Sequence, residues 1–358
     1  MTSEVGSCDN FGGVLRQLFF INLQELFLAM KHISILIPEE EIIQNTVISV
    51  IGAYKIFSVV NQYFVKLGET APFKIELVGN SKKVNLNEGM FSMQPDINFK
   101  QVTKTDLIVI PPTSLNEKTI KQNAVFVPWI VSQYKHGAEI ASLCTGAFLL
   151  ASTGLLDGKN CSTHWLAAEK FREQSPKVNP VADKLITEEY GIYTNGGAYS
   201  FLNLLLHLVE RYCGREVAIY CSKVGQIDME RNCQSAFSIF LGQKNHADEP
   251  IKTAQDYIEN NVTNKISVEE LAVAHGLSKR NFERRFKKAT ANTPVEYIQR
   301  AKIEHAKKNL ETGKKNVNEV MYEIGYLDRQ AFRNSFKKFT GLLPLEYRRK
   351  YNKEAAVG

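Results

Sequence analysis

The sequence predicts two folded parts, an α/β N-terminal domain on a parallel sheet and an all-α C-terminal domain. Its 358 residues suit two domains at roughly 100–200 residues each. Short apolar runs alternate with helical patterns over residues 31–222, whereas residues 251–358 show helical patterns only. Residues 251–358 carry 22 basic and 13 acidic side chains, a net of +9, while the rest of the chain carries 22 and 25, a net of −3. A basic tail on a near-neutral body is typical of a nucleic-acid-binding module, although a solvated basic surface has the same charge.

The composition excludes several classes of protein. The hydrophobic fraction of 44% and the charged fraction of 23% are ordinary for globular domains, which excludes disordered and collagen-like chains. No apolar stretch approaches the ~20 residues of a membrane span, so no membrane contact is expected. Six cysteines, none in a CxxC pair, predict a reducing cytoplasm, no disulfide scaffold, no metal site and no cofactor.

Residues 1–30 are expected to form an N-terminal extension outside the fold. An apolar run there resembles a signal peptide, yet Asn22, Gln24 and Glu25 interrupt it and no cleavage site follows. Met30 directly precedes the first strand pattern, so it is an alternative start of the natural chain.

The α/β prediction depends on apolar runs that match the length of buried strands. The expected strands cover 33–37, 73–78, 106–110 and 139–143. Helical patterns cover 48–64 and 124–134, and a further helix is expected just after Cys144. Such alternation predicts a parallel sheet covered on both faces, over a domain of residues 31–222.

The pattern fades after residue 222. Residues 223–250 are polar and read as a linker, with the domain boundary near 245–250. Residues 251–351 are expected to form the second domain, and residues 352–358 a tail.

The C-terminal domain contains an internal repeat. Phe282 and Phe286 recur 50 residues later as Phe332 and Phe336, and Pro294 and Tyr297 recur in the same register. Each copy has a short helix, a glycine turn and a second helix with its phenylalanines inward, so helix-turn-helix units are predicted at 267–290 and 316–340. A long helix from Pro294 to Leu310 connects them.

The second helix of each unit has a polar outer face that suits DNA. Arginine, asparagine and glutamine can pair with base edges in a major groove. The residues expected on these outer faces are Lys279, Arg280, Asn281, Arg284, Arg329, Gln330, Arg333 and Asn334. A helical bundle that binds protein is the alternative, but it does not explain why both repeats expose the same residue types.

Residues 251–351 resemble the DNA-binding domain of the AraC/XylS family of transcription regulators. The resemblance rests on the motifs at 267–272, 276–278, 282–286 and 324–326, on Pro294 and on residues 341–347. It implies that the outward residues of the two second helices, Lys279, Arg280, Asn281, Arg284, Arg329, Gln330, Arg333 and Asn334, are the base contacts, and that Ser278, Lys287 and Lys337 meet phosphate. Independently of the resemblance, two such helices about one helical turn (~34 Å) apart could enter successive major grooves. The resemblance also implies an activator more often than a repressor, RNA polymerase as a partner, and a homodimer formed through the N-terminal domain.

The N-terminal domain contains a candidate nucleophile. Cys144 lies where a strand ends and a helix begins, the geometry of a nucleophile elbow, and a helix N-terminus would lower the pKa of its thiol. His164 follows at another strand end and is the candidate base. Asn195 and Gly196 form a strand-to-helix turn whose backbone donors could hold a small anion.

Residues 31–240 resemble the class I glutamine amidotransferase-like superfamily, best over 139–222, and in particular amidase-like sensor domains fused to AraC-type domains. The motifs are those at 144–151, 154–158, 163–165 and 193–197. This implies a flavodoxin-like sheet. Members commonly have an acidic residue after the first strand that contacts the nucleophile. Ser49 occupies that register here, and Glu39, Glu40 and Glu41 come too early in the chain.

Without a carboxylate, acid–base catalysis is poorly supplied, so the domain is interpreted as a non-catalytic sensor. Its expected pocket residues are Cys144, Thr145, His164, Trp165, Asn195 and Gly196. The other cysteines after residue 150 are expected to pack in the interior, and His207 to be a hydrogen-bonded core histidine.

The sequence therefore predicts a sequence-specific DNA-binding regulator, with double-stranded DNA and a small polar metabolite as partners. Two alternatives remain. One is a cysteine-dependent amidase or hydrolase, using Cys144 and His164, with an attached DNA-binding domain. The other is a structural DNA-bending protein without an effector.

Overall fold

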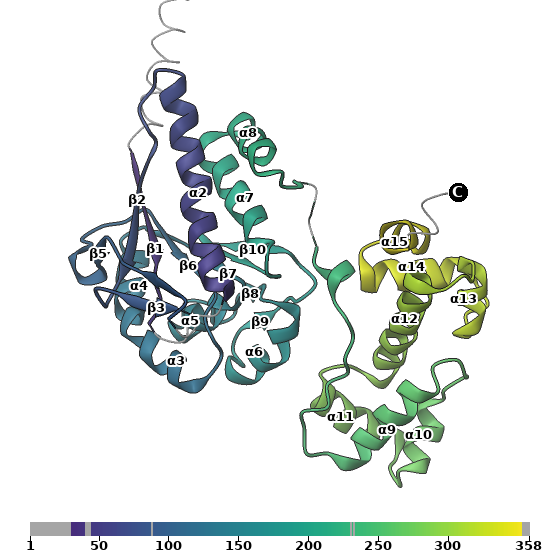
Figure 1. Ribbon diagram of the computed structural model, residues 1–358. Coiled ribbons are helices and arrows are strands. Elements are labelled where there is room, and N and C mark those ends of the chain that lie inside the picture. The colour runs from purple at the N-terminus through teal and green to yellow at the C-terminus, as the bar shows by residue number, and fades with distance from the viewer. Residues whose placement is uncertain (1–29, 40–43, 87–88, 230, 232, 353–358) are drawn as a thin grey trace, which may run out of the picture. The chain divides into compact units, whose positions relative to one another are not determined.

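The computed structural model describes residues 30–39, 44–86, 89–229, 231 and 233–352, so nearly all of the expected 1–30 extension lies outside the described residues. The chain divides into two compact units between residues 232 and 233 (Figure 1). Each unit is described by itself.

A seven-stranded sheet forms the centre of the N-terminal unit, in the order β10-β11-β7-β6-β1-β2-β5. All neighbouring strands are parallel except β10 and β11. The strands are β1 (Lys31–Leu36), β2 (Phe73–Gly79), β5 (Ile97–Asn98), β6 (Leu107–Ile110), β7 (Glu139–Leu143), β10 (Ile186–Glu189) and β11 (Ile192–Asn195). Two short pairs lie apart: β3 (Val84–Leu86) with β4 (Phe91–Met93), and β8 (Asn160–Cys161) with β9 (Asn179–Pro180).

Helices cover both faces of this sheet. Successive strand residues point to opposite faces, so Val109 packs in one core and Ile108 and Ile110 in the other. The first core receives α2 (Gln44–Lys66), α7 (Phe201–Cys213) and α8 (Arg215–Gly225). The second receives α4 (Val127–Lys135), α5 (Ala147–Ser152) and α6 (Ala168–Gln174); α3 (Glu117–Asn123) lies beside α5. The predicted doubly covered, flavodoxin-like sheet is confirmed.

Among the described residues, α2 is the one helix long and apolar enough to cross a membrane by length and composition. In the sequence, Lys55, Asn61 and Gln62 interrupt its apolar residues, so no unbroken apolar run marks the helix. Its inner residues Val50, Ala53, Phe57 and Val60 are at most 1% exposed and belong to the first core. Packing against the sheet accounts for the hydropathy of this inner face.

The C-terminal unit is helical. Its helices are α9 (Glu249–Asn260), α10 (Val268–Ala274), α11 (Lys279–Thr290), α12 (Pro294–Thr312), α13 (Val317–Glu323), α14 (Arg329–Thr340) and α15 (Pro344–Tyr351). Two separate cores form, one around Phe282 and Phe286 and the other around Phe332 and Phe336. Because α12 contributes to both, it is the structural connector of the two predicted repeats.

The predicted linker 223–250 is not one open stretch of chain. Helix α8 continues to Gly225, and residues 233–248 pack against the C-terminal helices. The division between the two units lies near residue 232, earlier than the predicted 245–250. Contacts with residues far along the chain, which local polarity does not reveal, order this segment.

Candidate nucleic-acid interface and effector site

Helices α11 and α14 are built alike. Ser278 caps α11 by accepting a hydrogen bond from the Asn281 amide, and Asp328 caps α14 by accepting one from the Ala331 amide. Phe282 and Phe286 in α11, like Phe332 and Phe336 in α14, lie at i and i+4 and are at most 1% exposed. Because one face of each helix is buried, the polar face is directed outward.

The predicted base-contact residues lie on these outer faces. Seven are exposed and Asn281 is half-buried; the exposed ones are Lys279, Arg280, Arg284, Arg329, Gln330, Arg333 and Asn334. Arg284 donates to Asn281 Oδ1 over 2.8 Å, and Gln330 donates to Asn334 Oδ1 over 2.9 Å. These bonds orient the side chains along the helix surface. The predicted phosphate contacts Ser278, Lys287 and Lys337 are also exposed.

Two cations of α11 are paired with carboxylates. Lys279 forms an ion pair with Glu269 on α10. Arg285 makes two hydrogen bonds to Asp248, from Nε over 2.9 Å and from Nη2 over 2.6 Å. The guanidinium of Arg285 holds the pKa of the Asp248 carboxyl below its usual value. Arg285 is thus directed toward its own unit.

Cys144 has the backbone of an elbow. Its φ of +54° lies in the left-handed region that a side chain rarely adopts. Three contacts hold the turn: the Cys144 amide donates to Asn195 Oδ1 over 3.1 Å, Thr163 Oγ1 donates to the Cys144 carbonyl over 3.1 Å, and Thr145 Oγ1 donates to the Thr113 carbonyl over 2.9 Å. The elbow predicted from the sequence is present.

The chemistry predicted for this elbow differs from what the structure shows. Cys144 is 2% exposed, and burial raises the pKa of its thiol to about 12. The prediction of a lowered thiol pKa is therefore wrong. A 3₁₀ turn (Cys144–Gly146) and the six-residue α5 follow the cysteine, and their partial charge does not offset the desolvation of a thiolate.

His164 is not joined to the thiol. Its Nδ1 accepts a hydrogen bond from the Leu166 amide over 3.1 Å, which caps the 3₁₀ turn Trp165–Ala167. Burial lowers the pKa of His164, so the imidazole is neutral at pH 7. Among the described residues, no hydrogen bond links His164 to Cys144. His164 and Trp165 are half-buried, with ring centres 5.7 Å apart.

Asn195 and Gly196 support the elbow. Asn195 is fully buried, accepts from the Cys144 amide and donates to the Gly196 carbonyl over 3.0 Å. The Gly196 amide donates to the Leu185 carbonyl over 2.8 Å. Because the Gly196 amide already donates this hydrogen bond, it is not one of the backbone donors that could bind an anion, contrary to the prediction from the sequence.

The acidic partner of the superfamily has no described counterpart here. Ser49 is buried in α2 and donates to the Thr46 carbonyl. The Glu39 carboxylate accepts from the amide and hydroxyl of Ser81. Glu40 and Glu41 lie outside the described residues. In the parts of the chain that the structure describes, no carboxylate hydrogen-bonds Cys144 or His164.

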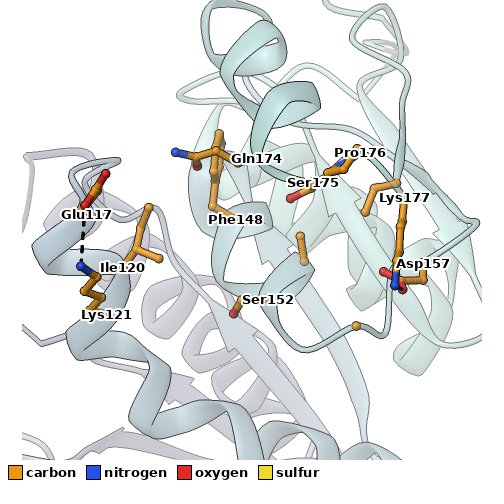
Figure 2. Close-up of a pocket in the computed structure, with 13 residues that line it drawn as sticks. Glu117, Ile120, Lys121, Phe148, Ser152, Asp157, Gln174, Ser175, Pro176 and Lys177 are labelled. Carbon is orange, nitrogen blue, oxygen red and sulfur yellow. Dashed lines mark ion pairs between the residues drawn. The ribbon is translucent and has the colours of Figure 1, made fainter.

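A pocket of about 530 Å³ lies beside α5, the helix that follows the elbow, and Cys144 is not among the residues that line it (Figure 2). It is lined from α3, α5, α6 and the loops near them. Phe148 forms part of its wall, and the ion pairs Glu117–Lys121 and Asp157–Lys177 lie at its rim. None of the six predicted pocket residues is among those that line it. Cys144, Thr145, Asn195 and Gly196 are buried in the elbow's own packing, whereas His164 and Trp165 are half-buried.

The remaining expectations are partly corrected. His207 is hydrogen-bonded, but to Glu188 with 40% of its side chain exposed, so it is a surface residue of α7 and not a core one. Cys161 and Cys221 are buried as predicted, whereas Cys213 and Cys233 are half-buried. No group of three or more possible metal ligands occurs among the residues described.

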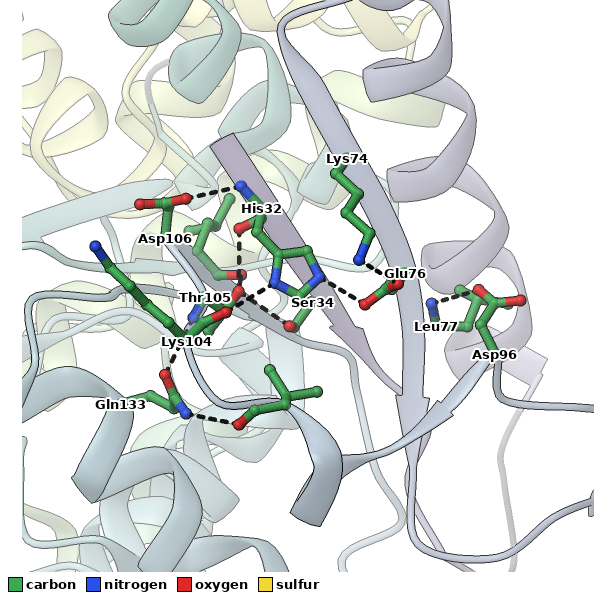
Figure 3. A network of polar contacts seen from close by, with 12 residues as sticks. His32, Ser34, Lys74, Glu76, Leu77, Asp96, Lys104, Thr105, Asp106 and Gln133 are labelled. Carbon is green, nitrogen blue, oxygen red and sulfur yellow. Dashed lines mark hydrogen bonds and ion pairs between the residues drawn. The ribbon is translucent and has the colours of Figure 1, made fainter. Parts of the chain in front are cut away.

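Sequence reasoning missed a polar network at the opposite end of the sheet (Figure 3). His32 Nε2 lies 2.8 Å from Glu76 Oε2, and its Nδ1 lies 3.0 Å from the Lys104 carbonyl. Its amide donates to Asp106 over 2.7 Å. These bonds join β1 to β2 and to the loop before β6, which is a structural role.

Known proteins match both units. A family described as "Helix-turn-helix domain" matches residues 271–350, and the "DJ-1/PfpI family" matches residues 54–211. The regulator GbdR of Pseudomonas aeruginosa is 24% identical over 75% of this chain and 72% of its own length. The transcriptional activator AarP of Providencia stuartii is 33% identical over 26% of this chain and 68% of its own length.

Among solved structures, an AraC family transcriptional regulator from Pseudomonas putida matches with 17% identity and a TM-score of 0.42. The match covers 54% of this chain and 98% of that one.

Proposed function

The chain belongs to the HTH-type transcriptional regulators that join an AraC-type DNA-binding domain to a DJ-1/PfpI-type domain, and on this premise we propose how it reads DNA and senses its signal. The observation that carries the proposal is the duplication: two helices, α11 and α14, expose the same classes of side chain from the same repeat position. A single such face would be ordinary, whereas two faces joined by one helix suit two grooves of one duplex.

In this proposal, Arg284 and Arg333 make the central base contacts. Both are exposed on their helices, and a guanidinium can donate two hydrogen bonds to a guanine edge. The exposed residues Lys279, Arg280, Arg329, Gln330 and Asn334, with the half-buried Asn281, complete the reading faces. Lys287 and Lys337, in the last turns, contact phosphate, as does Ser278 at the start of α11.

The N-terminal unit is the proposed sensor of a small polar metabolite, bound beside the elbow and not transformed there. Burial raises the pKa of the Cys144 thiol, and among the described residues neither a base nor a carboxylate is hydrogen-bonded to that thiol. His164 and Trp165 are half-buried beside the elbow, so their rings can contact a ligand while Cys144 and Asn195 shape the floor. Binding would shift the equilibrium between states that differ in promoter occupancy.

We further propose a homodimer formed by the N-terminal unit, acting in the cytoplasm as an activator that contacts RNA polymerase. The outer face of α2 supports the dimer: Ile48, Ile51 and Tyr54, at successive three-residue steps, are 38%, 58% and 45% exposed. An apolar stripe of this kind favours burial against an identical stripe.

Two measurements test these proposals. In-vitro selection from random duplexes should yield a site with two half-sites about one helical turn apart, and Arg284→Ala and Arg333→Ala should each relax the preference at a different half-site. A selected site with one half-site, or unchanged selection in both variants, would refute the choice of reading faces.

Cys144→Ala separates the sensor from the cysteine hydrolase. A promoter response that persists in Cys144→Ala supports a sensor without thiol chemistry. Hydrolysis of an amide by the purified protein, abolished in the same variant, would instead establish an enzyme.

A further inference from the structure

Residues 233–248, here called the strap, are bound along the C-terminal unit ahead of α9. The strap begins against α15, where Tyr351 Oη donates to the Ala236 carbonyl over 3.0 Å and Lys350 Nζ lies 4.3 Å from the centre of the Phe237 ring. Its first part thus belongs to the second helix-turn-helix unit.

The middle of the strap is held by a buried ion pair on α12. Lys307 and Glu304 are 4% and 8% exposed, and their Nζ and Oε2 atoms lie 2.7 Å apart. Lys307 Nζ also donates to the Ser238 carbonyl over 2.5 Å, and Glu304 Oε2 accepts from the Phe240 amide over 3.1 Å. Removing two charges from water is costly unless their hydrogen bonds are completed, and here the strap's backbone completes them.

The strap ends on the first helix-turn-helix unit. The Phe240 ring packs edge-on against Tyr297, with centres 4.9 Å apart. Gln255 Nε2 donates to the Gln243 carbonyl over 2.9 Å. Asp248, the last strap residue, binds Arg285 of α11 through two hydrogen bonds. One continuous segment therefore contacts both units that carry a reading helix.

A second tie joins the same units on another face of α12. Lys302 Nζ donates to the Ile324 carbonyl, after α13, over 2.7 Å, and to the Asn264 carbonyl, in the turn after α9, over 3.2 Å. Five residues along a helix correspond to a rotation of roughly 140°, so the ties through Lys302 and Lys307 lie on different sides of the connector.

We propose that the strap is an integral part of the DNA-binding unit, and that Glu304 and Lys307 are positioning residues that hold α11 and α14 at one fixed spacing. This inference rests on the proposed function, in which both helices read DNA. When the spacing between α11 and α14 is fixed, binding of one helix to its half-site places the other at its own groove without a further loss of rotational freedom. Half-sites separated by the wrong number of base pairs are then bound weakly.

The test is the double variant Glu304→Leu with Lys307→Met in the full chain. It replaces a buried ion pair by apolar side chains of similar size, a change that is often neutral for stability, while it removes both bonds to the strap. The matched control is Glu249→Leu with Lys252→Met, which removes the same residue types at the same i,i+3 spacing from a solvent-accessible pair on α9, with Glu249 exposed and Lys252 half-buried.

The probes are the duplex obtained by in-vitro selection with the wild-type protein, the same duplex with 5 base pairs inserted between its half-sites, and duplexes that retain a single half-site. The double variant should bind the intact duplex at least roughly tenfold more weakly, since an effective concentration is lost. It should bind single half-sites as the wild type does, and discriminate less against the insertion.

An unchanged affinity of the double variant for the intact duplex would overturn the inference, as would an equal loss on single half-sites, which indicates general damage. If the wild-type protein binds the duplex with the insertion as tightly as the intact duplex, the proposal that both helices read DNA is refuted. Failure of the inference and failure of the proposed function are therefore distinguishable. The control pair should behave as the wild type on all duplexes.

Hydrogen exchange of the wild-type protein decides the matter if the double variant does not fold. The Phe240 amide should exchange as slowly as amides in the middle of α12, because its bond to Glu304 opens only with the unit. Exchange at the rate of an unstructured peptide would show that the strap is not part of the unit.

Discussion

Alkylation of Cys144 provides a direct test of the sensor interpretation. The perturbation is iodoacetamide at pH 8, applied to the native and to the denatured protein. Because the thiolate is the reactive form, a thiol with a pKa of about 12 is ionised to roughly one part in 10⁴ at this pH. An unfolded cysteine, with a pKa of about 8.5, is ionised to roughly one quarter.

The ratio of these fractions predicts that native Cys144 reacts roughly 10³-fold more slowly than denatured Cys144, even before its 2% exposure slows access further. Peptide mass spectrometry measures the rate at Cys144 separately from the other cysteines, and Cys144→Ser identifies its peptide. A native rate within about tenfold of the denatured rate would refute the argument from burial. It would also restore the thiol as a candidate nucleophile.

Three further changes have defined outcomes. Arg284→Ala or Arg333→Ala should cost about 1–3 kcal/mol of DNA-binding free energy in titrations with the selected duplex. Lys287→Ala should instead reduce the slope of log K against log salt by about one. Equal behaviour of the three variants would contradict the assigned roles. Gly146→Ala should destabilise the N-terminal unit by about 1–3 kcal/mol in denaturant unfolding, because an added Cβ would lie 2.6 Å from the Ile110 carbonyl oxygen; a wild-type midpoint would show that the turn can move. Asp248→Asn should lower the stability of the C-terminal unit by roughly 1 kcal/mol at pH 7. Arg285 lowers the folded-state pKa of Asp248. The stability that this ion pair adds is therefore fully present above the unfolded pKa of about 3.9 and is lost as pH falls through the folded pKa. The difference in unfolding free energy between wild type and variant should close below about pH 4.

The sequence predicted the elements whose signal is local. Runs such as 107–110 are apolar without interruption because both faces of a parallel strand are buried. Phe282 and Phe286, repeated 50 residues later, located α11 and α14, the two helices proposed to read DNA, because the i,i+4 spacing marks the buried side. The polar outer faces of both helices then followed, because they lie opposite the buried phenylalanines.

Features that depend on distant contacts were not predictable in this way. The residue types around Cys144 are those of a reactive elbow, and only the three-dimensional packing shows that its thiol is desolvated. The strap is polar over 243–248 and reads as a linker, since its partners on α12 and α15 lie tens of residues away. One signal was available: Lys307 interrupts the stripe of Ile303, Ala306 and Leu310, which are all buried, and a lysine in such a stripe requires partners.

The order of the strap bears on how a metabolite signal could reach DNA. A flexible tether would leave the reading helices indifferent to events beyond residue 233, except through local concentration. Here, a displacement of the strap must break the bonds of Ser238 and Phe240 to α12 and that of Asp248 to α11. Each of these bonds involves a charged side chain and contributes about 1.5–3 kcal/mol, so together they exceed the 1–3 kcal/mol typical of coupling between two sites. A signal is therefore expected to displace the strap together with α11 and α14, and not to detach it from them.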